Sequence, residues 1–460
     1  MTWLAILVVP VFVAYYLGVI QRTGLFTADS LFVYLQLLMF LGSLPLLDSI
    51  YGAADSIHGY VMAYTLVAYM CASALVQWSW NSGQRSPSIE RRSITSFRPG
   101  AKFFIWLVIS GVVVVVYYSA VGYSAFFSGL SGLISGQEQD VATLRLESYA
   151  GSRYLFPGYV NQFKNVLFPA LVVVLVAYWG RSTKNRRLVS GVLVLAAIFS
   201  LLGTGQRSPL VLFAIVLATF AYLVSGRRVT GKTVFAVFFV FVPVITLATA
   251  VLGRSGAGNS SVLGLLGEFL QRILASNQTS SVVGWRYIYR RGPQETFGGE
   301  WLESLQGLLP GSAGSTLANE IFAVLYGSDR GTSPPSLWGS IYYNFGYSGI
   351  AVAPVILAMI FAGVTRLGTR SKERNTLELI GIAGVFATIG TWVAGTPVYL
   401  LNTGIAVYAV VWVIGSRQSL TADPFGDAKG LSRRRRSRRP RPRPRPRPRR
   451  IVAANDIHAE

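Results

Sequence analysis

Long apolar stretches separated by short polar connections make up most of this chain. Eleven of them reach or approach the roughly 20 residues that a helix needs to cross the hydrocarbon core of a bilayer. We therefore predict eleven membrane-spanning helices, near residues 3–20, 30–47, 59–80, 103–124, 165–180, 188–203, 208–225, 233–252, 337–364, 377–394 and 397–415. The pattern predicts an all-α polytopic integral membrane protein.

The composition agrees with this pattern, because only 13% of the 460 residues are charged and 52% are hydrophobic. In an average soluble protein about 25% of residues are charged. The one cysteine, Cys71, lies inside an apolar stretch, and the two histidines, His58 and His458, are far apart in the sequence. These residues offer neither a disulfide framework nor a histidine cluster for a metal ion. We expect no metal and no cofactor.

Lysine and arginine gather in connections that a strict alternation of spans places on one side of the membrane. These connections are 85–102, 181–187, 227–232, 366–374 and the segment after the last span. Since cytoplasmic connections are enriched in lysine and arginine, we expect the N-terminus outside and the C-terminus in the cytoplasm. Two long connections, about 125–164 and 253–336, then fall on the outer side.

The sequence divides into a membrane domain, residues 1–415, and a basic tail, residues 416–460, whose segment 433–450 accounts for more than half of the net charge of +22. The Arg-Pro repeat of residues 433–450 cannot form a helix and is expected to be extended and disordered. A polybasic segment close behind a span is typical of binding to anionic lipid headgroups. We favour that partner over a protein and over nucleic acid.

The two long outer connections are the regions most suited to hold a functional site, because loops of this length are usually functional. Within them, Glu147, Glu300 and Glu320 are candidate general bases, which the sequence does not rank. Arg153, Arg286 and Arg290 are candidate cations for an anionic ligand. Helical apolar spacing over 262–291 predicts a helix along the membrane surface. The aromatic residues of this loop suit sugar rings or, as we prefer, the membrane interface; they are Trp285, Tyr287, Tyr289, Trp301, Tyr326 and Trp338.

A charged residue interrupts the apolar pattern between the spans at 188–203 and 208–225. The turn 203-GTGQRSPL-210 places Arg207 among glycines, with Pro209 at the start of the second span. Glycines let a ligand approach the backbone, and helix-start amides with a guanidinium suit a phosphate group. The alternative is an arginine whose head extends to lipid headgroups. We predict that Arg207 binds a phosphate group, which in the family resembled below would be the diphosphate of a carrier lipid.

A resemblance to a known family rests on the stretch 331-GTSPPSLWGSIYYNFGYSGIAVAP-354. It resembles the signature of bacterial O-antigen polymerases of the Wzy type, also called oligosaccharide repeat unit polymerases. The turn at 203–210 and the segment 153-RYLFPGYVNQFKN-165 are similar to parts of the same family. The residues that carry the resemblance in the first stretch are Ser333, Pro334, Asn344, Gly346 and Gly349. Many relatives have an acidic residue at the position of Ser340, so no catalytic carboxylate is carried over to it.

The resemblance implies an enzyme of the bacterial cytoplasmic membrane that makes a surface polysaccharide, whether O-antigen, capsule or exopolysaccharide. Such an enzyme joins oligosaccharide repeat units carried on a polyprenyl diphosphate, at the outer face of the membrane. A sugar hydroxyl of the acceptor attacks the anomeric carbon of the donor, and the lipid diphosphate leaves. The partners implied are the lipid-linked oligosaccharide, a repeat-unit flippase and a chain-length regulator.

Three alternatives remain at this stage. An O-antigen ligase shares the architecture, but ligases resemble one another in a histidine of the large outer loop, and 253–336 contains none. Another lipid-linked-sugar glycosyltransferase would have carboxylates in an outer loop after the first span, and 21–30 is expected to be cytoplasmic. A transporter of glycans would carry charges or broken helices within the membrane. We see no internal repeat that would support the transporter.

Overall fold

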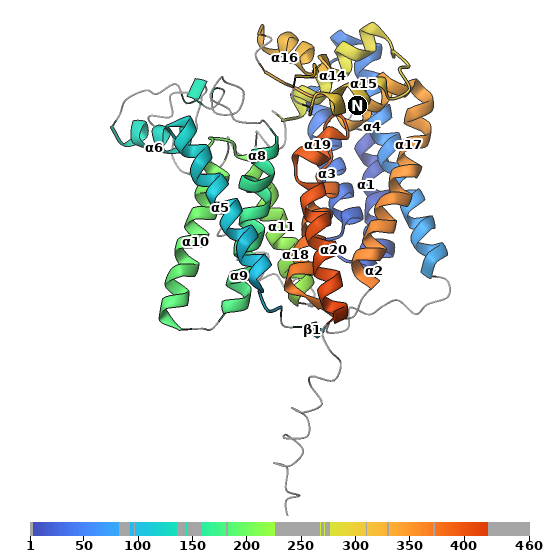
Figure 1. Ribbon diagram of the computed structural model, residues 1–460. Helices are drawn as coiled ribbons and strands as arrows, with labels where there is room; N and C mark the ends of the chain where they lie inside the picture. The colour runs from blue at the N-terminus through green and yellow to red at the C-terminus, as the bar shows by residue number, and fades with distance from the viewer. Residues whose placement is uncertain are drawn as a thin grey trace, which may run out of the picture. The chain divides into compact units, whose positions relative to one another are not determined.

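The computed structural model describes residues 3–81, 93–135, 158–225, 277–370 and 373–421, with short gaps at 96, 181–182, 310 and 329–330. It also describes a few isolated positions between 141 and 271. The predicted span at 233–252 and the tail beyond 421 lie outside these residues. The described chain is almost entirely helical (Figure 1), which confirms the predicted fold class in its coarse form.

The described residues form helices and one pair of short strands. The first part contains α1 (Trp3–Tyr15), η1 (Tyr16–Ile20), α2 (Gln21–Thr23), α3 (Ala28–Ser43), η2 (Leu44–Leu46), η3 (Ser49–Tyr51), α4 (Ala53–Asn81), β1 (Ser93–Thr95), α5 (Ala101–Val121) and α6 (Ala125–Ser135). The middle part contains α8 (Tyr159–Asn161), η4 (Gln162–Leu167), α9 (Phe168–Trp179), α10 (Lys184–Leu202) and α11 (Ser208–Ser225). The last part contains α14 (Asn277–Arg291), α15 (Gly299–Gln306), α16 (Leu317–Tyr326), α17 (Leu337–Arg370), β2 (Glu373–Asn375), α18 (Thr376–Gly390), α19 (Val398–Asn402) and α20 (Ile405–Thr421).

Within the described residues, eight helical segments are long and apolar enough to cross a membrane. They are Trp3–Thr23, Ala28–Leu46, Ala53–Trp80, Ala101–Val121, Tyr159–Trp179, Lys184–Leu202, Ser208–Ser225 and Leu337–Arg370. Each coincides with a predicted span. The last two predicted spans form shorter apolar helices, because a turn at Thr403 and Gly404 separates α19 from α20 and α18 ends at Gly390.

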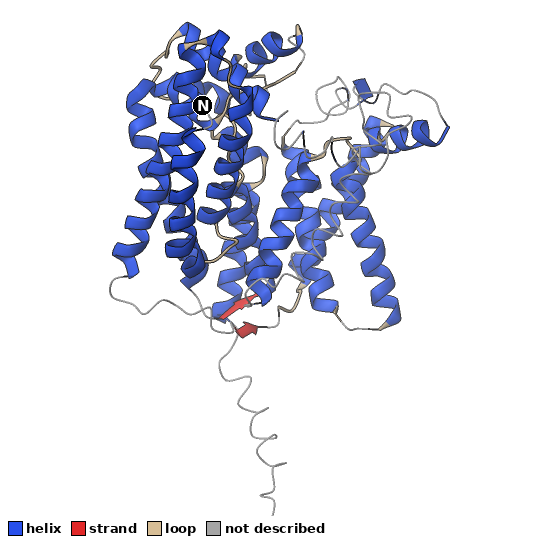
Figure 2. Cartoon of the chain, turned by 180° about the vertical axis from the view of Figure 1, so that it is seen from behind, coloured by secondary structure: helices blue, strands red, loops and turns tan. Residues whose placement is uncertain are grey.

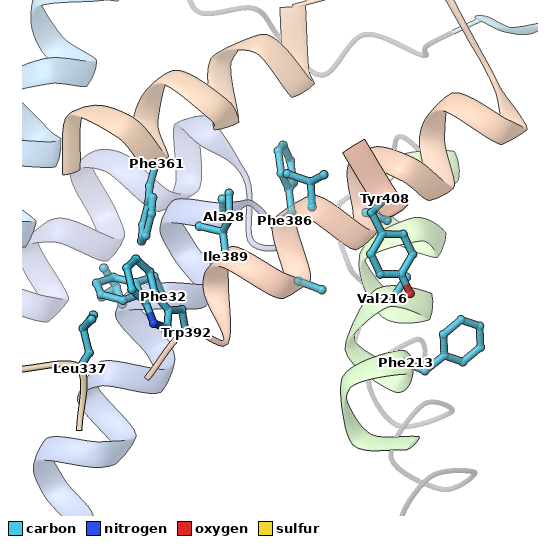
Figure 3. Packing of buried hydrophobic residues seen from close by; sticks show 14 of the residues in the cluster. Ala28, Phe32, Phe213, Val216, Leu337, Phe361, Phe386, Ile389, Trp392 and Tyr408 are labelled. Atoms are coloured by element: carbon cyan, nitrogen blue, oxygen red, sulfur yellow. The ribbon is translucent and has the colours of Figure 1, made fainter. Parts of the chain in front are cut away.

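Helix α18 is short because it lies inside the bundle, where it does not have to match the bilayer. All of its residues from Leu377 to Gly390 are buried, and it packs against α11, α3 and α9. Figure 3 shows Phe386 and Ile389 of this helix within the core. Nearby, Phe32 of α3 lies with its ring centroid 5.0 Å from that of Phe361 on α17. The core thus joins helices from both ends of the sequence.

The helices run alternately between two ends of the bundle. One end, which we call the loop end, contains the connections 47–52, 122–124 and 203–207 and helices α14, α15 and α16 (Figure 1). The opposite end holds the two strands (Figure 2), paired in parallel with Ser93 opposite Glu373. Cations flank the spans at this second, cation-rich end; they include Arg98, Lys102, Lys184, Arg186, Arg187, Arg366, Arg370 and Arg417.

Helix α17 is broken near the loop end, at Gly346, whose φ of 60° and ψ of −151° are not helical. The break frees carbonyl groups of the preceding turn, which must find other donors. Backbone amides of the segment 292–298 supply them: Gln294 N–H donates to the carbonyl of Tyr343, and Phe297 N–H donates to that of Asn344. The break therefore docks the α14–α15 connection onto α17.

Candidate functional site

A cavity of about 690 Å³ opens at the loop end. Four segments far apart in the sequence line it: the start of the span at 159, the turn before α11, the loop after α15, and the α19–α20 region. Pockets of 300–1,000 Å³ are the usual size for small-molecule sites in proteins. We call this cavity the loop-end cavity.

The lining of the loop-end cavity combines polar and apolar side chains, and its apolar members include Pro209, Leu308 and Leu309 of the loop-end segments. Its amide and hydroxyl side chains are those of Tyr159, Asn161, Asn165, Gln206, Ser208, Ser312, Tyr399, Asn402 and Thr403. Val166, Leu212, Phe213 and Tyr408 follow one or two turns further along their helices. Figure 3 shows Phe213 and Tyr408 on α11 and α20. Within the described part of the chain, no carboxylate contributes to this lining.

The predicted glycine–arginine turn forms part of the cavity wall. Gln206 and Ser208, on either side of Arg207, line the cavity, and Arg207 itself is half-buried. A hydrogen bond holds this turn in place, because Ser124 Oγ donates to the carbonyl of Gly203 at 2.9 Å. A Cβ atom at Gly203 would meet the hydroxyl end of Tyr118, so a larger residue there would have to displace that side chain. The structure thus places Arg207 beside the cavity.

Arg286 contacts protein groups rather than the cavity. Its Nε donates to Asp55 Oδ1 at 2.7 Å, and its Nη2 donates to Asp55 Oδ2 at 2.6 Å and to the carbonyl of Leu46 at 3.1 Å. The guanidinium also lies 3.6 Å from the ring centroid of Tyr51. The hydrogen bonds to Asp55 raise the pKa of Arg286. Arg290 is exposed, 5.9 Å from the same ring.

Glu300 belongs to a buried polar cluster that includes the motif residue Asn344. Glu300 Oε1 accepts from Ser304 Oγ and Ser315 Oγ, and its Oε2 accepts from Asn344 Nδ2 at 3.1 Å. Asn344 also donates to the carbonyl of Ser340, and its Oδ1 accepts from Thr296 Oγ1. Every polar atom of the Asn344 side chain is therefore used to hold α15 and its preceding loop on α17.

The other motif residues also hold the loop-end helices together. Ser333 and Ser280 are joined through their hydroxyl groups, and Ser280 Oγ donates to the carbonyl of Pro334. A Cβ atom at Gly349 would lie 2.5 Å from that of Phe345. Ser340 is buried and accepts from Trp301 Nε1 at 2.8 Å.

Glu320 lies in a separate group on α16. Its Oε2 accepts from the hydroxyl of Tyr287 and from Arg291 Nη1, the latter at 2.7 Å. Its Oε1 accepts from Thr316 Oγ1. The hydrogen bond from Tyr287 is the main cause of a lowered pKa for Glu320, with Thr316 and Arg291 acting in the same direction. Burial in turn raises the pKa of Tyr287 to about 12.

Two candidate residues, Glu147 and Arg153, belong to the segment between α6 and α8, of which the structure describes only isolated positions. Glu147 is helical and exposed at one of the isolated described positions between α6 and α8. Arg153 lies outside the described residues. The structure therefore brings Arg207 to the cavity, Glu300 to Asn344, and Glu320 to Arg291, and it does not gather these residues into one site.

The aromatic residues of the second loop differ from our expectation of a membrane interface belt. Trp285 and Trp338 are buried, with their indole N–H groups donating to the carbonyl of Ala54 and to Gln36 Oε1. Helix α14 packs against α4, α16 and α3 through Trp285 and Ile288. The belt prediction was wrong for these two tryptophans, because both are buried within the protein. Of the helix predicted over 262–291, the structure describes α14, and most of 262–276 lies outside the described residues.

Sequence reasoning missed the amide side chains of the cavity, Asn161, Asn165, Gln206 and Asn402. The available signal was their position, since an amide within a turn or two of the end of an apolar span has to find polar partners. Comparisons with protein-family models, with curated proteins and with solved structures give no match for this chain. The site is therefore interpreted from its own chemistry.

Proposed function

We propose that this protein is a membrane glycosyltransferase that polymerises oligosaccharide repeat units linked to a polyprenyl diphosphate. The observation that carries the proposal is the loop-end cavity, whose lining combines amide and hydroxyl side chains with apolar ones. A lipid-linked sugar has the same combination, with a polar head on an apolar chain. Asparagine, glutamine and hydroxyl groups provide the donors and acceptors that sugar hydroxyls need.

The proposal includes a topology of eleven spans with the loop end outside the cytoplasmic membrane of a bacterium. It rests on the cations at the opposite end, which cytoplasmic connections favour, and on the alternation of the described helices between the two ends. The segment between α11 and α14 must join the cation-rich end to the loop end. One span at 233–252 satisfies this requirement.

In the proposed reaction, an acceptor hydroxyl attacks the anomeric carbon of the donor. A carbon–oxygen bond to the acceptor forms, the bond from the anomeric carbon to the diphosphate oxygen breaks, and both electrons leave with the polyprenyl diphosphate. Arg207, beside the cavity, is placed to stabilise the charge that develops on this leaving group. No nucleotide is required, because the diphosphate is already an activated leaving group.

The hydroxyl proton has to pass to a base. Glu300 accepts hydrogen bonds from three side chains, and Glu320 is paired with Arg291. These contacts favour structural roles for both carboxylates. Glu147, exposed between α6 and α8, is therefore our choice among the three candidate bases.

Gel analysis of the surface glycan tests the proposed function in a strain that lacks this gene. We expect the ladder of chain lengths to collapse to a single repeat unit and to return when the gene is restored. A ladder of normal length in the deletion strain would contradict the proposal. Polymer that accumulates on the carrier lipid would instead indicate a ligase.

A transporter of lipid-linked glycans is the second candidate, and one observation favours it. Asp29 is buried at the start of α3, where its carboxylate accepts from Tyr69 and from Ser73 and Gln77 on α4. Ionisable residues inside membrane bundles often belong to transport pathways. In the deletion strain, this function predicts lipid-linked single repeats confined to the inner leaflet, with no repeat unit on the surface.

A further inference from the structure

Lys164 is a buried cation in the span that begins at Tyr159. Its side chain is wholly inaccessible, and Nζ donates to Asn165 Oδ1 at 2.9 Å. The remaining neighbours are aromatic, with Nζ 5.0 Å from the ring centroid of Tyr117 and 5.9 Å from that of Tyr118. Among the ion pairs of the described residues, no carboxylate pairs with Lys164.

This arrangement is costly for a protein that needs only to fold. A charged group inside a membrane bundle is unfavourable unless a counter-charge or water compensates for it. One amide oxygen and two aromatic faces compensate for the ammonium only in part. Lys164 also lies in a π-helix, η4, and such irregular turns occur frequently at functional sites.

The neighbours of Lys164 connect it to the loop-end cavity. Asn165, its hydrogen-bond partner, lines the cavity together with Asn161 and Val166 of the same segment. Because Asn165 Oδ1 accepts from Lys164, its Nδ2 is the group left to donate to a ligand. Tyr118, which flanks the ammonium, packs on Gly203 in the turn that carries Arg207. The buried lysine is therefore linked to the cavity by a single hydrogen bond, through Asn165 of the cavity wall.

We propose that Asn165 binds the phosphate groups of the ligand in the loop-end cavity and that Lys164, behind it, attracts them by its charge, with the ligand supplying the counter-charge that Lys164 lacks. The ligand class is a phosphate ester on an apolar chain, so this inference rests on the proposed function and adds a second cation to Arg207. Asn165 donates to the anion from Nδ2, and Lys164 acts as a point charge on the far side of the Asn165 amide. No covalent step is involved.

Binding and thermal unfolding of the purified full chain in phosphatidylcholine nanodiscs test this proposal. The probes are farnesyl diphosphate, farnesol and inorganic pyrophosphate, which separate the phosphate groups from the apolar chain. The variant is Lys164→Met, which keeps the length of the side chain and removes its charge. Lys184→Met is the matched control, because it removes the same charge from an exposed position at the cation-rich end.

We expect farnesyl diphosphate to raise the melting temperature of the wild-type protein and of Lys184→Met, and farnesol to have little effect. Lys164→Met should bind farnesyl diphosphate about 10- to 100-fold more weakly, because the positive charge behind the Asn165 amide is lost. Without ligand, Lys164→Met should melt at or above the wild-type temperature, because an incompletely compensated charge has been removed.

Three results would overturn the proposal. The first is tight binding of farnesyl diphosphate by Lys164→Met, and the second is a wild-type protein that does not bind it. The third is a stronger response to pyrophosphate than to farnesyl diphosphate, which would show a free-anion site. If Lys164→Met does not fold, Lys164→Arg, which keeps the charge, is tested in its place. Its dissociation constant for farnesyl diphosphate must then lie within about 3-fold of the wild-type value. The glycan ladder tests polymerisation separately from all of these measurements.

Discussion

Arg286 and Asp55 form a bidentate ion pair that joins α14 to the first turn of α4, with Arg286 Nη2 2.6 Å from Asp55 Oδ2. Only 3% of the Asp55 side chain and 15% of the Arg286 side chain are exposed. Two parallel hydrogen bonds make this one of the stronger types of polar contact in proteins. The pair positions the loop-end helices on the bundle.

Replacement of Arg286 by alanine should therefore destabilise the protein rather than remove a ligand contact. Breaking a buried ion pair costs about 3 kcal/mol, because the remaining charge is left without compensation. We expect Arg286→Ala to lower the melting temperature of the purified protein clearly, and Arg286→Lys to lower it less. Arg290→Ala, at an exposed neighbouring position, is the control. A wild-type melting temperature for Arg286→Ala together with loss of polymer would assign Arg286 to the substrate instead.

The break in α17 predicts a strong preference for glycine at position 346. With φ at 60° and ψ at −151°, this backbone conformation is open almost only to glycine, and a Cβ atom would lie 3.1 Å from Glu295 Oε1. Gly346→Ala should cost about 1–3 kcal/mol of stability. Gly191→Ala is the control, because no atom lies within 4 Å of its Cβ position in α10. Equal melting temperatures for the two variants would contradict the structural role of the break.

The lowered pKa of Glu320 predicts a pH dependence of stability. A carboxylate whose pKa is lower in the folded than in the unfolded state stabilises the fold fully above its unfolded value, near 4.5. This contribution is lost as the pH falls from there through the folded pKa. The melting temperatures of the wild type and Glu320→Gln should therefore differ most near neutral pH and converge in acid. A difference that grows on acidification would show that the carboxylate is not held by Tyr287 and Arg291.

Arg207 should affect catalysis more than folding. If its guanidinium stabilises the departing diphosphate, Arg207→Ala should reduce polymer formation by at least about 100-fold at unchanged membrane abundance. Arg207→Lys should restore only part of the activity, because lysine lacks the planar fork. The measurement is the glycan ladder of a complemented deletion strain, with Lys184→Ala as control. Equal ladders for the lysine variant and the wild type would favour an arginine that only reaches lipid headgroups.

Much of the fold could be predicted from the sequence, because span length and charge bias are local properties. The eight long spans coincide with predicted ones, and the turn at Arg207 lies at the end of a helical hairpin as expected. The shortness of α18 was not predictable in this way. A wholly buried apolar helix has the same composition as a lipid-facing span, and only its neighbours distinguish the two.

The candidate site was predictable only in part, because its chemistry depends on contacts between distant segments. The sequence singled out Glu300 and Asn344 separately, and their hydrogen bond joins positions that are 44 residues apart. Lys164 lies at the end of the predicted connection 125–164, directly before the predicted span at 165–180. Its burial follows from the aromatic rings of α5, which no local pattern connects to it.

Reconstitution of the purified chain in liposomes tests the central claim most directly. The only substrate is a polyprenyl-diphosphate-linked repeat unit, with no nucleotide present. We predict a ladder of glycan lengths and the release of one polyprenyl diphosphate for each bond formed. Leu212→Trp, which fills the loop-end cavity, should abolish both products while it still melts cooperatively. Products no longer than one repeat from a folded wild-type protein, or an undiminished ladder from Leu212→Trp, would contradict the account.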